Sequence, residues 1–168
     1  MYKRILYKKA YRKLYNITPV KFDCGQICNK KCCNGNDEMG MILFPEEISY
    51  LQQLNVNFLN FRQETNIWQD INFAFCNGAC NRKYRPLSCR IYPFTPYIDK
   101  QGILKIIKDP RAKYVCPLLY IGDIKINNRF SRTIKKVFKE LIQDNEIREH
   151  IDSNSRILDE YARFTGDL

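Results

Sequence analysis

Residues 76–94 read CNGACNRKYRPLSCRIYPF and contain three of the eight cysteines of the chain. These cysteines are surrounded by four basic residues, Arg82, Lys83, Arg85 and Arg90. No acidic residue lies between Ile71 and Ile98. Because charge interactions strengthen at low dielectric, basic side chains are valuable beside a buried anionic centre. The stretch therefore indicates a site where thiolates need compensating positive charge, the alternative being a solvated basic loop.

The remaining cysteines lie on both sides of this stretch. Residues 24–40 hold four of them among glycine, asparagine and lysine residues, a composition typical of a loop. A predicted hairpin over residues 94–108 reverses the chain, so that Cys116 can return to the 76–89 loop. The eight candidate metal ligands are Cys24, Cys28, Cys32, Cys33, Cys76, Cys80, Cys89 and Cys116.

These cysteines favour metal binding over disulfides. The N-terminal segment MYKRILYKKAYRKLYNI has too many charges for a secretory signal, which favours a reducing cytoplasm. Adjacent residues such as Cys32 and Cys33 cannot meet disulfide geometry without strain. Soft thiolates select zinc or iron–sulfur, and eight of them suffice for two tetrahedral zinc sites or two cubane clusters. We expect iron–sulfur of the [4Fe-4S] type, with zinc as the alternative.

The length of 168 residues fits a single domain, and the mixture of short strands and helices predicts an α+β fold. We expect a small cysteine-rich metal-binding domain with a short antiparallel hairpin. Its cysteine core spans residues 22–118, between helical flanks at residues 1–21 and 119–168. No apolar run approaches the ~18–20 residues that a transmembrane segment needs.

Hydrophobic periodicity predicts the individual elements. A basic amphipathic helix over residues 2–16 is expected to dock through Tyr7, Tyr11, Leu14 and Tyr15. A helical stripe of apolar residues runs from Phe44 to Phe61. Further expected elements are strands at residues 41–44, 71–75, 94–98 and 103–108, with a turn at Gly102, and helices at residues 129–143 and 155–164.

Three segments resemble the YkgJ-like cysteine-cluster family, which is described as a zinc- or iron-chelating domain. They read FDCGQICNKKCC at residues 22–33, CNGACNRKYRPLSCRIYPF at residues 76–94 and DPRAKYVCPL at residues 109–118. The resemblance implies that all eight cysteines are metal ligands. The chain departs from the family in the gaps before the double cysteine, which have three residues where the family often has two.

The leading functional hypothesis is an iron–sulfur protein in electron transfer, or a redox accessory module for an unidentified partner. Arg85 and Arg90 would then donate hydrogen bonds to cluster or ligand sulfurs. The alternative is a zinc-stabilised basic module that binds RNA or a protein, which the net charge of +10 allows. An enzyme with a nucleophilic cysteine is less favoured, because the one histidine, His150, lies in a polar stretch and is expected on the surface.

Overall fold

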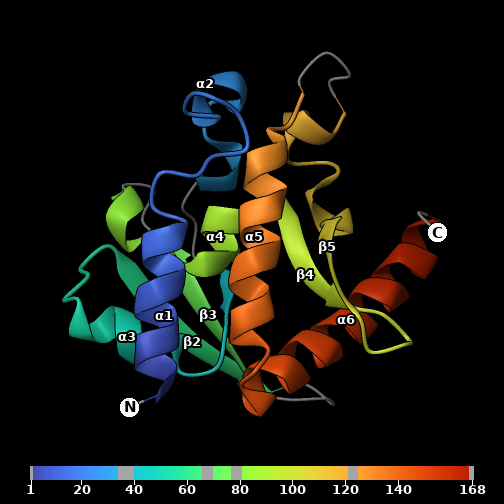
Figure 1. Ribbon diagram of the computed structural model, residues 1–168. Coiled ribbons are helices and arrows are strands. Elements are labelled where there is room, and N and C mark those ends of the chain that lie inside the picture. Colours follow the sequence, from blue (N-terminus) through green and yellow to red (C-terminus); the bar gives the residue numbers. More distant parts are fainter. Residues whose placement is uncertain (1, 34–39, 66–69, 77–80, 121–124, 167–168) are drawn as a thin grey trace.

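The computed structural model of the protein describes residues 2–33, 40–65, 70–76, 81–120 and 125–166 (Figure 1). Its longer helices are α1 (Tyr2–Lys13), α3 (Glu47–Gln53), α5 (Asn128–Leu141) and α6 (Asn145–Thr165). The strands are β1 (Met41–Leu43), β2 (Leu59–Thr65), β3 (Asp70–Cys76), β4 (Phe94–Ile98) and β5 (Leu104–Lys108). The short helices are α2 (Gly25–Cys28), α4 (Leu87–Ile91) and the 3₁₀ turns η1 (Lys31–Cys33), η2 (Arg82–Tyr84), η3 (Pro110–Ala112) and η4 (Pro117–Leu119). The predicted α+β fold is confirmed.

Two antiparallel sheets organise the strands. The first has the order β1-β3-β2, and its register places Met41 opposite Ala74 and Leu59 opposite Cys76. The second is the predicted hairpin of β4 and β5, whose turn contains Gly102 at a φ of 75°. Such a positive φ is accessible to glycine because it has no Cβ. The hairpin turns the chain back towards the segment that carries Cys116.

The terminal helices supply much of the apolar core instead of merely flanking it. In Figure 1, α1 and α5 stand side by side in front of the strands, and α6 crosses beneath the hairpin. Helix α1 docks as expected through Tyr7, Tyr11 and Leu14, which are buried, whereas Tyr15 is exposed. Lys3, a basic residue of this helix, is also buried and pairs with Glu46 and Glu146.

The continuous helix expected from Phe44 to Phe61 is wrong. Helix α3 ends at Gln53, and Asn55 then adopts a left-handed conformation with a φ of 51°. Leu59 and Phe61 belong instead to strand β2, where they lie on one face because side chains alternate along a strand. The helical spacing across this boundary was coincidental.

The last helix begins ten residues earlier than residue 155, at Asn145. The carboxylate of Asp144 caps it by accepting a hydrogen bond from the Ile147 amide at 3.2 Å. Its buried face contains polar residues among the apolar ones, which hid the helical pattern in the sequence: Ile147, His150, Ile151, Asn154, Ser155, Leu158 and Ala162. No helix among the described residues is long and apolar enough to cross a membrane.

Candidate thiol site

Five cysteines from three distant segments line one small cavity of about 30 Å³, which we call the thiol cavity. The first segment, α2 with η1, contributes three of them, α4 contributes one, and the residue that precedes η4 contributes the last. The five are Cys24, Cys28, Cys32, Cys89 and Cys116. The fold therefore brings both cysteine-rich stretches of the sequence to a single place.

Tight local turns position the first three cysteines. The Asp23 carboxylate accepts a hydrogen bond from the Gly25 amide at 3.0 Å and starts the single turn of α2. Within that turn the Cys28 sulfur lies 3.8 Å from the Cys24 carbonyl oxygen, so the two cysteines are one helical turn apart. Asn29 and Lys30 then take positive φ angles of 49° and 57°, which ends the helix and redirects the chain into η1.

Backbone hydrogen bonds bring Cys89 and Cys116 to the same cavity. Cys89 lies in α4, whose first amide, that of Leu87, is bound by the Glu47 carboxylate at 2.8 Å. Cys116 follows the η3 turn after the hairpin, and its amide donates to the Ala112 carbonyl at 2.8 Å. The hairpin thus returns Cys116 to the cysteine region, as its position in the sequence predicted.

Three arginines line the thiol cavity, and two of them, Arg82 and Arg90, donate hydrogen bonds to carbonyl oxygens. Arg90 is 2% exposed, lies 4.5 Å from the centre of the Tyr11 ring and donates to the carbonyls of Lys83 at 2.6 Å and Arg85 at 2.7 Å. Arg82, which the ligand prediction left out, donates to the Ile17 carbonyl at 2.7 Å. The hydrogen bonds of Arg82 and Arg90 hold neighbouring backbone segments together around the cavity. Their guanidinium groups also add positive charge to it.

Burial favours the protonated form of two of these thiols, Cys24 and Cys116. Desolvation raises the pKa of Cys24, and it raises the pKa of Cys116 to about 11. Desolvation also raises the pKa of Tyr92, which lines the cavity beside Cys116. A cation that binds here must therefore displace protons, which is the usual coupling between thiolate ligation and pH.

The other predicted ligands are placed differently. Cys76 ends β3 opposite Leu59 and packs against the main apolar core, and it does not line the thiol cavity. Cys80 lies outside the described residues, and only the backbone of Cys33 is described. The six cysteines whose side chains are described are thiols rather than disulfides.

The five thiols are the type of ligand that a soft metal prefers. Their side chains, however, are not gathered closely enough to form a ready metal site. Within residues 2–33, 40–65, 70–76, 81–120 and 125–166, no three cysteine, histidine or carboxylate side chains form a ready metal-binding group. The cavity of about 30 Å³ has room for about two water molecules, and so for a single ion. A cubane of four irons and four sulfides is larger than this cavity.

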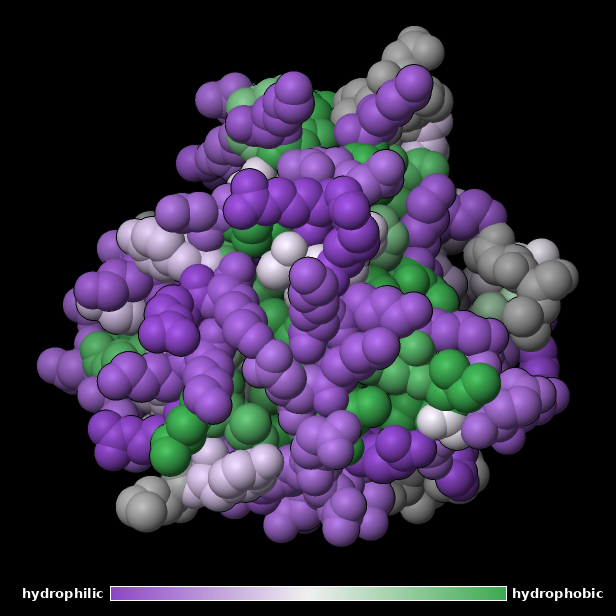
Figure 2. Space-filling view, in the orientation of Figure 1, coloured by the Kyte–Doolittle hydropathy of each residue, from purple (hydrophilic) through white to green (hydrophobic). Residues whose placement is uncertain are grey.

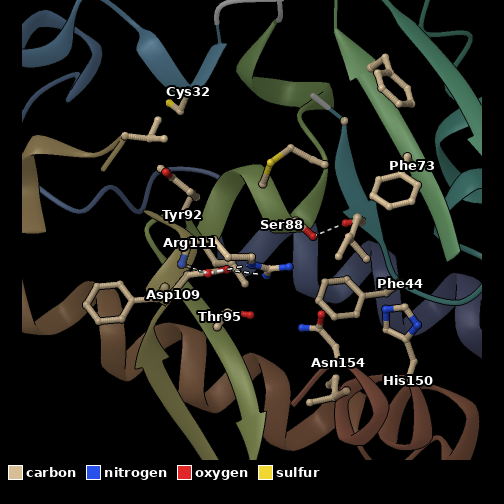
Figure 3. A pocket seen from close by; sticks show the side chains of 18 of the residues that line it. Cys32, Phe44, Phe73, Ser88, Tyr92, Thr95, Asp109, Arg111, His150 and Asn154 are labelled. Atoms are coloured by element: carbon tan, nitrogen blue, oxygen red, sulfur yellow. Dashed lines mark hydrogen bonds and ion pairs between the residues drawn. The ribbon is translucent and has the colours of Figure 1, made fainter. Parts of the chain in front are cut away.

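His150 is buried, not on the surface as expected. It is 6% exposed, and its ring packs edge-on against Phe44 with the ring centres 5.7 Å apart. Desolvation lowers the pKa of His150 to about 4. His150 and Cys32 line the same large cavity but lie at opposite ends of it (Figure 3), so they do not form a nucleophile–base pair.

Sequence reasoning missed Tyr92, and it named Arg82 only as one of the basic residues around the cysteines. Tyr92 follows α4 and lines both the thiol cavity and the larger cavity beside it. In the sequence, Tyr92 is marked by its position directly before Pro93 and three residues after Cys89.

No family model, curated protein or solved structure matches the chain. The resemblance to the YkgJ-like family therefore remains a prediction from the cysteine motifs.

Proposed function

We propose that the chain is a metal–thiolate protein whose centre occupies the thiol cavity. The observation that carries the proposal is the gathering of Cys24, Cys28, Cys32, Cys89 and Cys116 around one cavity. A thiol packs as a small hydrophobe, so the burial of one needs no metal, but the meeting of five from segments up to 92 residues apart in sequence calls for a further reason. Metal ligation gives that reason.

The first candidate is an iron–sulfur protein that transfers electrons or serves as a redox accessory module. Five thiols exceed the four ligands that a tetrahedral zinc ion takes, which favours a centre with several metal atoms. Such a cluster would supply one-electron chemistry. The positive charges of Arg82, Arg85 and Arg90 would favour its reduced, more negative state and raise its reduction potential.

The second candidate is a zinc-stabilised module that binds an acidic partner or RNA. The small volume of the thiol cavity favours a single ion. In addition, α1 and α5 pack together, and a contact between Lys13 and Glu140 links them. Figure 2 shows a mostly hydrophilic surface over these helices. Exposed basic residues on them are Arg4, Lys8, Lys9, Arg12, Lys13, Arg129, Arg132, Lys135, Lys136 and Lys139.

Anaerobic purification followed by iron, acid-labile sulfide and zinc analysis tests the proposal. The first candidate predicts a brown protein with equal iron and sulfide, whose visible absorption bleaches with dithionite. The second predicts a colourless protein with stoichiometric zinc and salt-sensitive retention on a polyanion column. A well-folded protein with neither metal, prepared in medium supplemented with both, would refute the proposal.

A further inference from the structure

The net positive charge of the chain lies on two neighbouring helices. Together α1 and α5 contain eleven basic residues and one acidic residue, Glu140, whereas the rest of the chain contains seventeen of each kind. The two helices therefore account for the whole net charge of +10. Because α1 and α5 pack side by side (Figure 1), the charge is concentrated on one side of the molecule, where it can attract a polyanion.

Ten of these eleven basic residues are exposed, and we call this surface, formed by the ten residues named above, the basic face. The buried side of α5 contains Phe130 and Ile134, and all five basic residues of this helix are exposed on its other side. Side chains three or four positions apart share a helix face, so Arg132, Lys136 and Lys139 form a row with a positive group about every 5 Å. Figure 2 shows the hydrophilic surface over the two helices.

Most of the basic face is not neutralised by carboxylates. Lys13 contacts Glu140, but within the described part of the chain no carboxylate forms an ion pair with the other nine basic residues of the face. The buried Lys3, in contrast, is paired with both Glu46 and Glu146. The charge of the basic face is therefore available to phosphate groups, which bind lysine and arginine with release of counterions.

The composition of the basic face favours nucleic acid over an acidic protein or a membrane. Six of its ten residues are lysines, which are depleted in protein–protein interfaces, whereas protein–DNA interfaces are much more positively charged. Helices that bind bilayers insert an apolar face. The apolar face of α1, which includes Leu6, Tyr7 and Ala10, is instead buried in the core of the domain.

Exposed tyrosines narrow the nucleic acid to a single strand. Tyr2 begins α1 and is 59% exposed, and Tyr15 lies two residues beyond the end of the helix and is 45% exposed. Aromatic rings beside basic groups stack on unpaired bases, and this contact is sequence-tolerant because every base has a π-face. The bases of a duplex are already stacked on one another, so a duplex gives these rings no equivalent partner.

We propose that the basic face binds the phosphate backbone of single-stranded nucleic acid without sequence preference, and that Tyr2 and Tyr15 stack on its bases. This inference develops the second candidate function and rests on it for the claim that the surface has a partner. It holds for either metal in the thiol cavity, because the basic face lies on α1 and α5 and the thiols lie on other segments.

Fluorescence anisotropy of a labelled 20-nucleotide oligo(U), titrated with the metal-loaded protein between 50 and 200 mM salt, tests the inference. The logarithm of the affinity should fall linearly with the logarithm of the salt concentration, by about 0.7 per phosphate contact. The triple variant Arg132→Gln, Lys136→Gln and Lys139→Gln should reduce this slope by about 2 and weaken binding at 50 mM salt by at least roughly tenfold. Tyr15→Leu should weaken binding roughly 5–150-fold and leave the slope unchanged.

Lys100→Gln, Lys108→Gln and Arg163→Gln form the matched control, because they remove the same charge from exposed positions outside the basic face. This control should retain the affinity and the slope of the wild type. Should the first triple variant fold poorly, Lys136→Gln alone should reduce the slope by about 0.7.

The inference is overturned if oligo(U) does not saturate the wild-type protein at 50 mM salt, or if the two triple variants lose affinity equally. Tighter binding of a 20-base-pair duplex than of oligo(U) would also overturn it, as would binding to vesicles that contain phosphatidylserine without binding to oligo(U). Metal content is measured on the same samples, so a metal-loaded protein that fails to bind oligo(U) contradicts this inference and leaves the metal–thiolate function standing.

Discussion

The carboxylate of Glu47 accepts a hydrogen bond from the Leu87 amide at 2.8 Å and so joins α3 to the helix that carries Cys89. The same carboxylate accepts hydrogen bonds from the Tyr11 hydroxyl at 2.6 Å and from the Phe44 amide at 3.0 Å. Glu47 is fully buried, and desolvation raises its pKa, while the three donors act in the opposite direction. One buried side chain thus links the N-terminal helix, α3 and the thiol site.

Glu47→Gln should therefore destabilise the protein by about 1–3 kcal/mol, because an amide offers one acceptor oxygen where the carboxylate offers two. A buried donor then loses its partner. Glu46→Gln is the matched control: Glu46 is largely exposed and binds Lys3, an ion pair whose contribution is about 0–1 kcal/mol. Urea unfolding of both variants measures the difference. Equal stability of the two variants would contradict the linking role of Glu47.

Cys89→Ser and Cys76→Ser test which cysteines hold the metal. Cys89 lines the thiol cavity and Cys76 does not. Cys89→Ser should weaken metal affinity by more than the roughly 10–100-fold that is typical for loss of a residue that only supports a ligand. Cys76→Ser should keep the metal in the thiol cavity. Metal per folded chain after dialysis is the measurement, and equal losses in both variants would place the centre elsewhere.

Local signals predicted the parts of the fold that depend on few residues. The hairpin of β4 and β5 follows from two β-prone runs around Gly102, and α5 follows from its strict apolar spacing. The sequence predicted that the hairpin returns Cys116 to the 76–89 loop, but it gave no sign that Cys116 also meets the first cysteine group. The mixing of both groups in one cavity is a property of the tertiary structure.

Other features lacked a sequence signal for physical reasons. The acceptors of Arg90 are backbone carbonyls, and every residue has one, so no pattern of side chains marks the role of Arg90. His150, Asn154 and Ser155 occupy the buried face of α6, and polar residues at core positions conceal the helical period. Ser155 is satisfied there by the Ile98 amide at 2.9 Å and the Ile151 carbonyl at 2.7 Å, contacts that only the folded chain creates.

Metal removal should loosen the thiol site before it affects the main core. Cys116 packs in a small apolar cluster with Val20, Ala112 and Leu118, separate from the large core that contains α5. Thiolate–metal bonding contributes about 10–16 kcal/mol in zinc-finger peptides, far more than so small a cluster can replace. After chelation, amide hydrogen exchange should rise in residues 24–33 and stay slow in α5. Equal loss of protection in both would show that the metal supports the whole domain.

His150 is the single histidine of the chain, so its pKa can be measured without interference from another histidine. Desolvation in the packed site beside Phe44 lowers the pKa of His150 to about 4 from an ordinary value of 6.5. Charged groups around it lie along the two cavities that it lines: Lys31, Glu64, Asp109 and Arg111 in one, and Glu46, Asp70, Glu146 and Glu149 in the other. Desolvation outweighs the pull of these acids on the histidine proton.

Between pH 6.5 and pH 4 the unfolded chain binds a proton at His150 that the folded chain does not, so the free energy of unfolding falls as the pH falls. At about 1.4 kcal/mol per pKa unit, this loss reaches about 3 kcal/mol at pH 4 and is absent above pH 7. His150→Phe keeps the ring against Phe44 and should remove this loss, leaving the dependence due to carboxylates. Urea unfolding of both proteins at pH 7 and pH 4.5 measures it. A wild-type histidine NMR signal that titrates near 6.5 in the folded state would show that His150 is solvated.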